Sequence, residues 1–202
     1  QGEIDWDAVK AAGFDFAILR VGFRGQTEGT VYEDERFEEN YAGATAAGLD
    51  VGVYFYSQAV TQEEAREEAD FVLDTLSGRS LQFPVAYDWE PADEVGVAAA
   101  GASSDDPART EETTPEEVTA FTNVFCERVA SGGYEPCYYT NKSMGYTTFD
   151  LEALENYPIW YAEYQPYPSF YYDFAIWQYT NEAEVPGIPE AADLNIAFRA
   201  FS

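Results

Sequence analysis

The chain alternates short apolar runs with amphipathic segments, and this alternation restricts its fold more than any other feature. The runs with the length and composition of strands cover residues 16–22, 51–57, 83–88, 136–140, 159–164, 174–179 and 193–196. Helical periodicity covers residues 6–12, 34–47, 62–76 and 115–130. Strands that alternate with helices along the chain predict a parallel sheet or barrel with right-handed crossovers.

The spacing of these segments changes after Thr140. The last strands follow one another too closely for full crossover helices, and only a short helical turn is expected at residues 151–156. The predicted fold is therefore an irregular α/β barrel rather than a regular eightfold one. Two helix starts are marked by N-cap candidates, each followed three residues later by a glutamate that can complete a capping box: Thr61 with Glu64 and Thr114 with Glu117.

Length and charge limit the number of domains and the kinds of partner. A chain of 202 residues can form one sizeable core, so a single domain over residues 1–202 is expected. The formal charge of -28 would repel nucleic acid and disfavours an anionic membrane surface. No stretch approaches the roughly 20 apolar residues that span a bilayer, and the first residues lack the features of a signal peptide. Export would therefore need a targeting segment outside this sequence.

The sequence contains no histidine, which removes Ser-His-Asp and Cys-His catalysis and every histidine-ligated metal site. Carboxylates are left as the candidate acid and base groups. The two cysteines, Cys126 and Cys137, are too few for a four-cysteine zinc site and lack the CxxC spacing of redox motifs. They either form a disulfide, which would indicate an oxidising compartment, or remain two buried thiols.

The stretch VAYDWEPADE, residues 85–94, places two acids one residue apart at the end of an expected strand. Side chains alternate along a strand, so Asp88 and Glu90 share a face with Ala86, whereas Tyr87 and Trp89 share the other face. Small residues suit the inside of a barrel, and barrel enzymes carry their chemistry at the C-terminal ends of strands. Acids at a strand end also commonly cap a helix or face solvent, so the spacing alone leaves both interpretations open.

Two inward carboxyl groups side by side would raise the pKa of one of them through like-charge repulsion and partial burial. A carboxyl group that keeps its proton near neutral pH can act as a general acid, as glycoside hydrolysis requires. Aromatic residues, 17% of the chain, could stack on sugar rings, although core packing accounts for most of them. Residues 92–114 are small and acidic without periodicity, which predicts a long loop beside the pair.

Longer motifs also follow one another in order along almost the whole chain. They are QGEIDWDAVKAAGFDFAILRVGFRG, DERFEENYAGATAAGLDVGVYFYSQAVTQEEAREEADFVL, PVAYDWE, GYEPCYYTN, IWYAEY, FAIWQYT and VPGIPEAADLN. WQY or DWE alone is a weak signal, but the ordered set resembles the family 25 glycoside hydrolases, the lysozymes that cut bacterial peptidoglycan. The resemblance implies a flattened (β/α)5β3 barrel that hydrolyses the β-1,4 bond between N-acetylmuramic acid and N-acetylglucosamine without a metal or organic cofactor.

The resemblance also implies roles for single residues. Glu90 matches the family's catalytic acid/base, and Asp193 matches a further active-site acid. Asp88 matches the companion that orients the substrate's 2-acetamido group as it attacks the anomeric carbon, a route that would retain the anomeric configuration. The residues that match groove-lining positions of the family are Tyr56, Tyr139, Trp160, Trp177 and Gln178.

One departure from the family concerns the N-terminus. The family begins with a strand that carries Asp-x-Ser a few residues before Gln-Gly, whereas this sequence starts at Gln1. Either the first barrel strand and its carboxyl group lie upstream of these residues, or the barrel has lost that strand. The first alternative is expected, because an open barrel would leave unpaired strand edges. Two alternative functions remain, a non-catalytic glycan-binding module on the same barrel and a glycosidase for another N-acetylated polysaccharide such as chitin. A monomer that acts outside the cell is expected.

Overall fold

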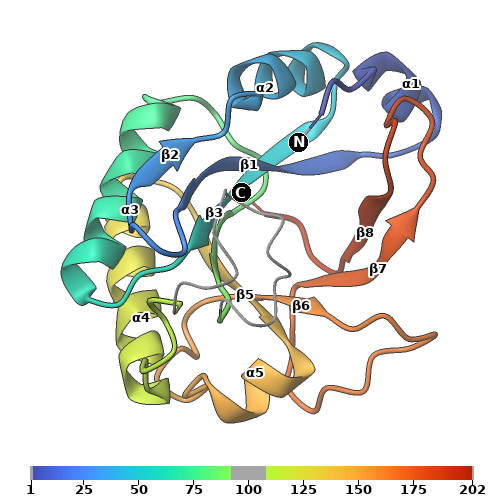
Figure 1. Ribbon diagram of the computed structural model, residues 1–202. Helices are drawn as coiled ribbons and strands as arrows, with labels where there is room; N and C mark the ends of the chain where they lie inside the picture. Colours follow the sequence, from blue (N-terminus) through green and yellow to red (C-terminus); the bar gives the residue numbers. More distant parts are fainter. Residues whose placement is uncertain (1, 92–107, 202) are drawn as a thin grey trace.

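The structure is a computed structural model that describes residues 2–91 and 108–201. Within these residues a single eight-stranded sheet runs in the order β2-β1-β3-β4-β5-β6-β7-β8 and curls into a half-barrel (Figure 1). The strands are β1 (Phe16–Arg24), β2 (Val31–Glu33), β3 (Asp50–Ser57), β4 (Val85–Trp89), β5 (Pro136–Asn141), β6 (Ile159–Ala162), β7 (Ile176–Ala183) and β8 (Ala192–Ala197).

The seven predicted strands are all present, and β2 is the additional one. Strands β1 and β3 to β7 pair in parallel, whereas β2 and β8 pair antiparallel at the two edges. Strand β2 is only three residues long and returns beside the end of β1, so it has too few residues to show a periodic pattern. The eighth strand of the observed sheet is therefore a short hairpin partner inside the given sequence.

Five helices lie within the described residues: α1 (Trp6–Ala11), which precedes β1, and α2 (Phe37–Ala46), α3 (Gln62–Leu76), α4 (Pro115–Ser131) and α5 (Lys142–Thr147), which connect strands. Helices α2, α3 and α4 follow one another around the outside of the curled sheet, and no helix separates β7 from β8 (Figure 1). Helix α5 was not predicted. The expected helical turn at residues 151–156 is present as consecutive turns, in which the Leu154 amide donates to the Asp150 carbonyl at 3.2 Å. The change of spacing after Thr140 therefore does mark the end of the long crossover helices.

The two expected N-caps are confirmed, but only one is a full capping box. Thr114 Oγ1 accepts from the Glu117 amide while the Glu117 carboxylate accepts from the Thr114 amide. Thr61 Oγ1 likewise accepts from the Glu64 amide. The Glu64 carboxylate instead accepts from the Val60 amide at 2.9 Å, because its other oxygen is held in an ion pair outside α3.

The core lies on both faces of the sheet. The larger cluster is under the helices and contains Tyr87 and Trp89 of β4. The smaller cluster is on the inner face and contains Ala86 with Tyr139 and Trp160. Side-chain alternation along β4 is therefore as predicted, with bulky residues outward and small ones inward.

Cys126 and Cys137 are both free and fully buried. The Cys126 thiol lies 3.9 Å from the Cys137 carbonyl oxygen, and burial raises the pKa of both thiols. Of the two alternatives for the cysteines, the structure has the buried thiols. No helix in the described part of the chain is long and apolar enough to cross a membrane.

Strands β1 and β8 do not pair with each other in the described residues, so the inner face of the sheet opens between them. A cavity of about 550 Å³ lies in this opening. Residues 16–19 of β1 and the whole of β8 line it, and Tyr54 and Trp160 form its floor toward the inner cluster. The half-barrel therefore has one open side, next to the strand that carries Asp193.

Candidate active site

The packing of β4 directs Asp88 to the inner face of the sheet. The Tyr87 ring packs against Phe125 of α4 with ring centroids 4.6 Å apart, and Trp89 Nε1 donates to the Ala59 carbonyl at 3.0 Å. These outward contacts fix the strand on both sides of Asp88, which is 7% exposed. Glu90 follows directly after the last strand residue and is half-buried. Both acids therefore lie at the C-terminal end of β4, as predicted.

The Asp88 carboxyl group has a pKa raised well above its usual value. Burial is the main cause, followed by the charge of Glu90 and a side-chain hydrogen bond between the two residues, while Arg20 partly opposes the shift. The prediction that one member of the pair would hold its proton more tightly is therefore met at Asp88. Asp88 Oδ1 is also buried and has no hydrogen-bond partner among the described residues, so it is available to a bound ligand.

Asp193 of β8 completes a group of three acids. Its negative charge helps to raise the pKa of Asp88, and its own pKa is raised because the surrounding protein desolvates the carboxyl group even though the residue reaches solvent. Burial is the main cause of the raised pKa of Tyr164, and the charges of the same three acids raise it further. The charges of Glu90 and Asp193 both act on Asp88, so the three acids lie within electrostatic range of one another.

Aromatic residues and amides surround the acids on the inner face. The Trp160 ring meets Tyr139 edge-on with centroids 5.0 Å apart, and its Nε1 donates to Asn195 Oδ1 at 2.8 Å. The hydroxyls of Tyr139 and Tyr164 both donate to Gln178 Oε1, at 3.1 and 2.7 Å. These contacts join β5, β6, β7 and β8 into one fixed wall beside the carboxyl groups.

Tyr56, at the end of β3, forms the opposite wall. Its hydroxyl accepts from Gln26 Nε2 at 3.4 Å and from Gln58 Nε2 at 3.3 Å. Burial raises the pKa of Tyr56, and the charges of Asp88 and Glu90 raise it further. Tyr56 therefore remains a neutral phenol close to both acids.

Trp177 is the one predicted site residue that the structure does not bring to the others. It belongs to the large outer cluster, its ring centroid lies 5.7 Å from that of Tyr179, and its Nε1 donates to the Glu163 carbonyl at 3.0 Å. Its neighbours Ile176 and Gln178 face inward, because side chains alternate along β7. Trp177 therefore packs on the outer face of the sheet and does not line the site.

Sequence reasoning missed several residues of the site. Tyr54 lies two residues before Tyr56 on β3 and contacts Trp160 edge-on at 5.9 Å, so strand alternation would have identified it. Gln58 lies two residues after Tyr56, so the same alternation would have placed it on the face of Tyr56. Gln26 and Tyr164 come from connecting segments, where no periodic signal shows which way a side chain points. No group of three or more acids or cysteines within residues 2–91 and 108–201 is placed to hold a metal ion.

Solved structures share this fold over nearly the whole chain. A bacterial lysozyme from Streptomyces coelicolor is 22% identical, with a TM-score of 0.72 over 98% of this chain and 88% of that one. A family 25 glycosyl hydrolase from Bacillus anthracis is 20% identical, with a TM-score of 0.75 over 98% of this chain and 84% of that one. At these identities the likeness concerns the fold.

Curated relatives match the sequence directly. The "Autolytic lysozyme" of Clostridium acetobutylicum is 29% identical over 96% of this chain, and "Lysozyme M1" of Streptomyces globisporus is 26% identical over 96% of it. The chain spans 52% of the length of the first and 64% of the second. The family model of "Glycosyl hydrolases family 25" matches residues 1–188, and the chain belongs to this family.

Proposed function

We propose that this protein is an N-acetylmuramidase that hydrolyses the β-1,4 bond between N-acetylmuramic acid and N-acetylglucosamine in bacterial peptidoglycan. The observation that carries the proposal is the buried Asp88, with its raised pKa and its unpartnered oxygen, beside Glu90 at the C-terminal end of β4. Two relatives are named lysozymes, and a structural neighbour, an autolysin of Streptococcus pneumoniae, is described in complex with a synthetic peptidoglycan ligand.

In the proposed mechanism Glu90 gives its proton to the glycosidic oxygen as the bond from that oxygen to the anomeric carbon breaks. The carbonyl oxygen of the substrate's own acetamido group forms the new bond to the anomeric carbon, so no covalent bond to the protein is made. Asp88 Oδ1 would accept a hydrogen bond from the acetamido N–H and so orient this group toward the anomeric carbon. Water, deprotonated by Glu90, then opens the cyclic intermediate, and the product retains its configuration.

The residues around the acids would hold the sugar chain. Trp160, Tyr139 and Tyr56 are 5%, 8% and 6% exposed, so they would contact the pyranose rings through ring edges. Gln178 holds the hydroxyls of Tyr139 and Tyr164. Asp193 would add negative charge opposite a transition state that resembles an oxocarbenium ion. No metal or organic cofactor enters this mechanism.

We propose further that the barrel is completed by one more strand, which would give the (β/α)5β3 arrangement. The support is the cavity of about 550 Å³ between β1 and β8, because β8 and the first part of β1, before its pairing with β2 at Gly22, turn an unpaired edge toward it. An extended segment of the same polypeptide there would bring a further carboxyl group to the site. Faster exchange of the β1 and β8 amides in the 202-residue chain than in a version with a longer N-terminus would support this closure, and equal exchange would count against it.

The broader setting is also a proposal. The charge of -28 disfavours nucleic acid and anionic membranes as partners. The same charge favours a soluble monomer. We place this single domain outside the cell, where peptidoglycan is accessible. Sedimentation and the location of the native protein would test these expectations.

The experiment that tests the function follows reducing ends released from purified peptidoglycan over time, with product masses measured at the end. Steady release of fragments that carry a reducing N-acetylmuramic acid is expected. Binding to cell walls without any release would instead support a glycan-binding module. The open side of the half-barrel is the observation that favours this alternative. Activity on chitin but not on peptidoglycan would assign another N-acetylated polysaccharide as the substrate.

A further inference from the structure

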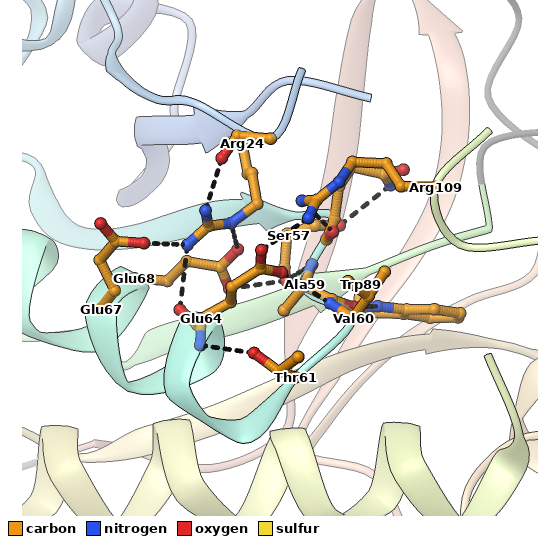
Figure 2. A network of polar contacts seen from close by, with 12 residues as sticks. Arg24, Ser57, Ala59, Val60, Thr61, Glu64, Glu67, Glu68, Trp89 and Arg109 are labelled. Atoms are coloured by element: carbon orange, nitrogen blue, oxygen red, sulfur yellow. Dashed lines mark hydrogen bonds and ion pairs between the residues drawn. The ribbon is translucent and has the colours of Figure 1, made fainter. Parts of the chain in front are cut away.

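The turn at residues 57–60 connects β3 to α3 and lies beside Glu90. Its backbone is held at successive positions by side chains from other elements, as Figure 2 shows in part. Arg109 donates to the Gln58 carbonyl at 3.1 Å, and Trp89 Nε1 donates to the Ala59 carbonyl at 3.0 Å. The Val60 amide donates to the Glu64 carboxylate at 2.9 Å. The turn therefore has a fixed shape without being part of the sheet.

The Gln58 side chain connects this turn to Glu90. It is fully buried, and its Nε2 donates to the Glu90 carbonyl at 2.7 Å and to the Ser57 carbonyl at 3.0 Å. The same Nε2 lies 3.3 Å from the Tyr56 hydroxyl. Because the Ser57 and Glu90 carbonyl oxygens can only accept, they assign the nitrogen of the amide to this side.

Glu90 needs such a contact because of where it lies on the strand. The last registered pair between β3 and β4 is Ser57 with Trp89, and Glu90 comes one residue later. Pro91 follows it and has no amide hydrogen to donate. The Gln58 amide therefore continues the connection between β3 and β4 by one residue beyond the end of the ladder.

A buried ionic network anchors the turn from the outer face of the sheet. Ser57 Oγ donates to Glu68 Oε2 at 2.7 Å, and Arg24 Nε donates to Glu68 Oε1 at 2.6 Å (Figure 2). Arg24 and Glu68 are 3% and 0% exposed in their side chains. A second ion pair, between Arg109 and Glu64 at 2.6 Å, holds the arginine that contacts Gln58. Small displacements of the turn therefore meet resistance from both sides.

We propose that Gln58 is a positioning residue for Glu90, and that Arg109 acts through Gln58. By fixing the Glu90 carbonyl, the amide of Gln58 sets the backbone from which the Glu90 carboxyl group projects toward the glycosidic oxygen. Positioning of this kind strongly affects rate, because displacement of a catalytic group by about 1 Å can cost roughly 100-fold. This inference rests on the proposed role of Glu90 as acid and base.

The test compares Gln58→Met with Gln82→Met. Methionine keeps the length of the side chain but removes the amide donor. Gln82 is a matched control because its side-chain oxygen also binds the β3 backbone, accepting from the Val51 amide at 3.3 Å, at the other end of the strand. Reducing-end release from peptidoglycan is measured across pH together with thermal unfolding.

For Gln58→Met, kcat is expected to fall roughly 10- to 100-fold while KM changes by less than about threefold, with a displaced pH profile of kcat. Gln82→Met is expected to keep the wild-type kcat. In a Glu90→Gln background, Gln58→Met should cause no further loss, because residues that act as a unit are not additive. Equal kcat for the two methionine variants, or a rise in KM with unchanged kcat, would overturn the proposal.

Two further measurements keep the test decisive. If Gln58→Met does not fold, Arg109→Met removes the donor to the Gln58 carbonyl and should lower kcat roughly threefold to 10-fold without raising KM. If the wild-type protein releases no reducing ends, the proposed function fails by itself. The ¹³C chemical shift of the Glu90 carbonyl then still reports on the hydrogen bond, and an unchanged shift in Gln58→Met would refute the positioning contact independently of catalysis.

Discussion

The protein buries acidic groups on both faces of its sheet, and the partners of these groups differ between the two faces. On the outer face Glu68 is paired with Arg24 and accepts from Ser57, so both of its oxygens have partners. On the inner face Asp88 lies beside two other acids, and one of its oxygens has no partner among the described residues. Removal of one partner from a buried ion pair is strongly destabilising, whereas a buried carboxyl group with an unpartnered oxygen and a raised pKa is typical of a functional site.

The difference follows from the elements that meet on each face. Arg24 ends β1 on the outer side, where α3 brings Glu67 and Glu68 to the guanidinium at 2.8 and 2.6 Å. On the inner side Arg20 pairs with Asp34 at 2.7 Å and only partly offsets the negative charge at Asp88. The inner face therefore keeps an excess of acid at the C-terminal end of β4, where the proposed substrate would bind.

The largest expected effect on stability comes from breaking the outer pair. Arg24→Met leaves Glu68 buried without its cation, and the loss of one partner of a buried pair costs about 3–5 kcal/mol in the free energy of unfolding. Chemical denaturation of the variant measures this loss. Arg36→Met, which removes an exposed pair with Glu39, is the control and should change stability by about 1 kcal/mol or less. Equal losses in the two variants would remove the distinction between the outer network and a surface ion pair.

Substitution of Asp88 on the inner face should instead lower activity without lowering stability. Asp88→Asn keeps the shape of the side chain and removes a group whose negative form is disfavoured by burial and by Glu90. We expect kcat to fall about 100-fold, while stability is unchanged at pH 5 and is equal to or greater than that of the wild type at alkaline pH. Kinetics and thermal unfolding at both pH values check this. A large loss of stability with full activity would make Asp88 a structural residue like Glu68.

A smaller effect is the pH dependence of stability. Burial raises the pKa of Glu68 from 4.5 to about 7 although Arg24 opposes the shift, so the folded state binds this proton more tightly than the unfolded state. The associated stability is complete below about pH 4.5 and is lost as the pH rises through 7. Melting temperatures should therefore fall by several degrees between pH 5 and pH 8.

Glu68→Gln should flatten that part of the profile. The exposed Glu63 on the same helix supplies the control, because Glu63→Gln should keep the wild-type slope. Identical slopes for both variants would assign the pH dependence to the general negative charge of the protein instead of to Glu68.

The sequence predicted the parts of the fold and the site that follow from periodicity. Alternation along β4 placed Asp88 inward and Trp89 outward, and both are as expected. The same rule, applied to β7, would have separated Trp177 from Gln178, whereas matching the whole WQY motif joined them. A motif shows that residues belong together in the sequence, but the pleat of the strand decides which of them reach the site.

Contacts between distant segments could not be predicted in this way. Gln58 and Glu90 are 32 residues apart, and their hydrogen bond depends on the register of β3 against β4. The strand β2 was missed because three residues are too short for a periodic pattern. Helix α5 was missed because its sequence, KSMGYT, has a glycine inside it and no apolar periodicity. The family resemblance supplied the roles of the acids, and the structure supplied their burial and their neighbours.

The measurement that tests the central claim most directly is the rate of reducing-end release by Glu90→Gln. If Glu90 is the acid beside the buried Asp88, loss of its proton should lower kcat on peptidoglycan about 1,000-fold, with an unchanged melting curve. Glu63→Gln should keep the wild-type rate under the same conditions. A rate for Glu90→Gln within about twofold of the wild type would contradict the account.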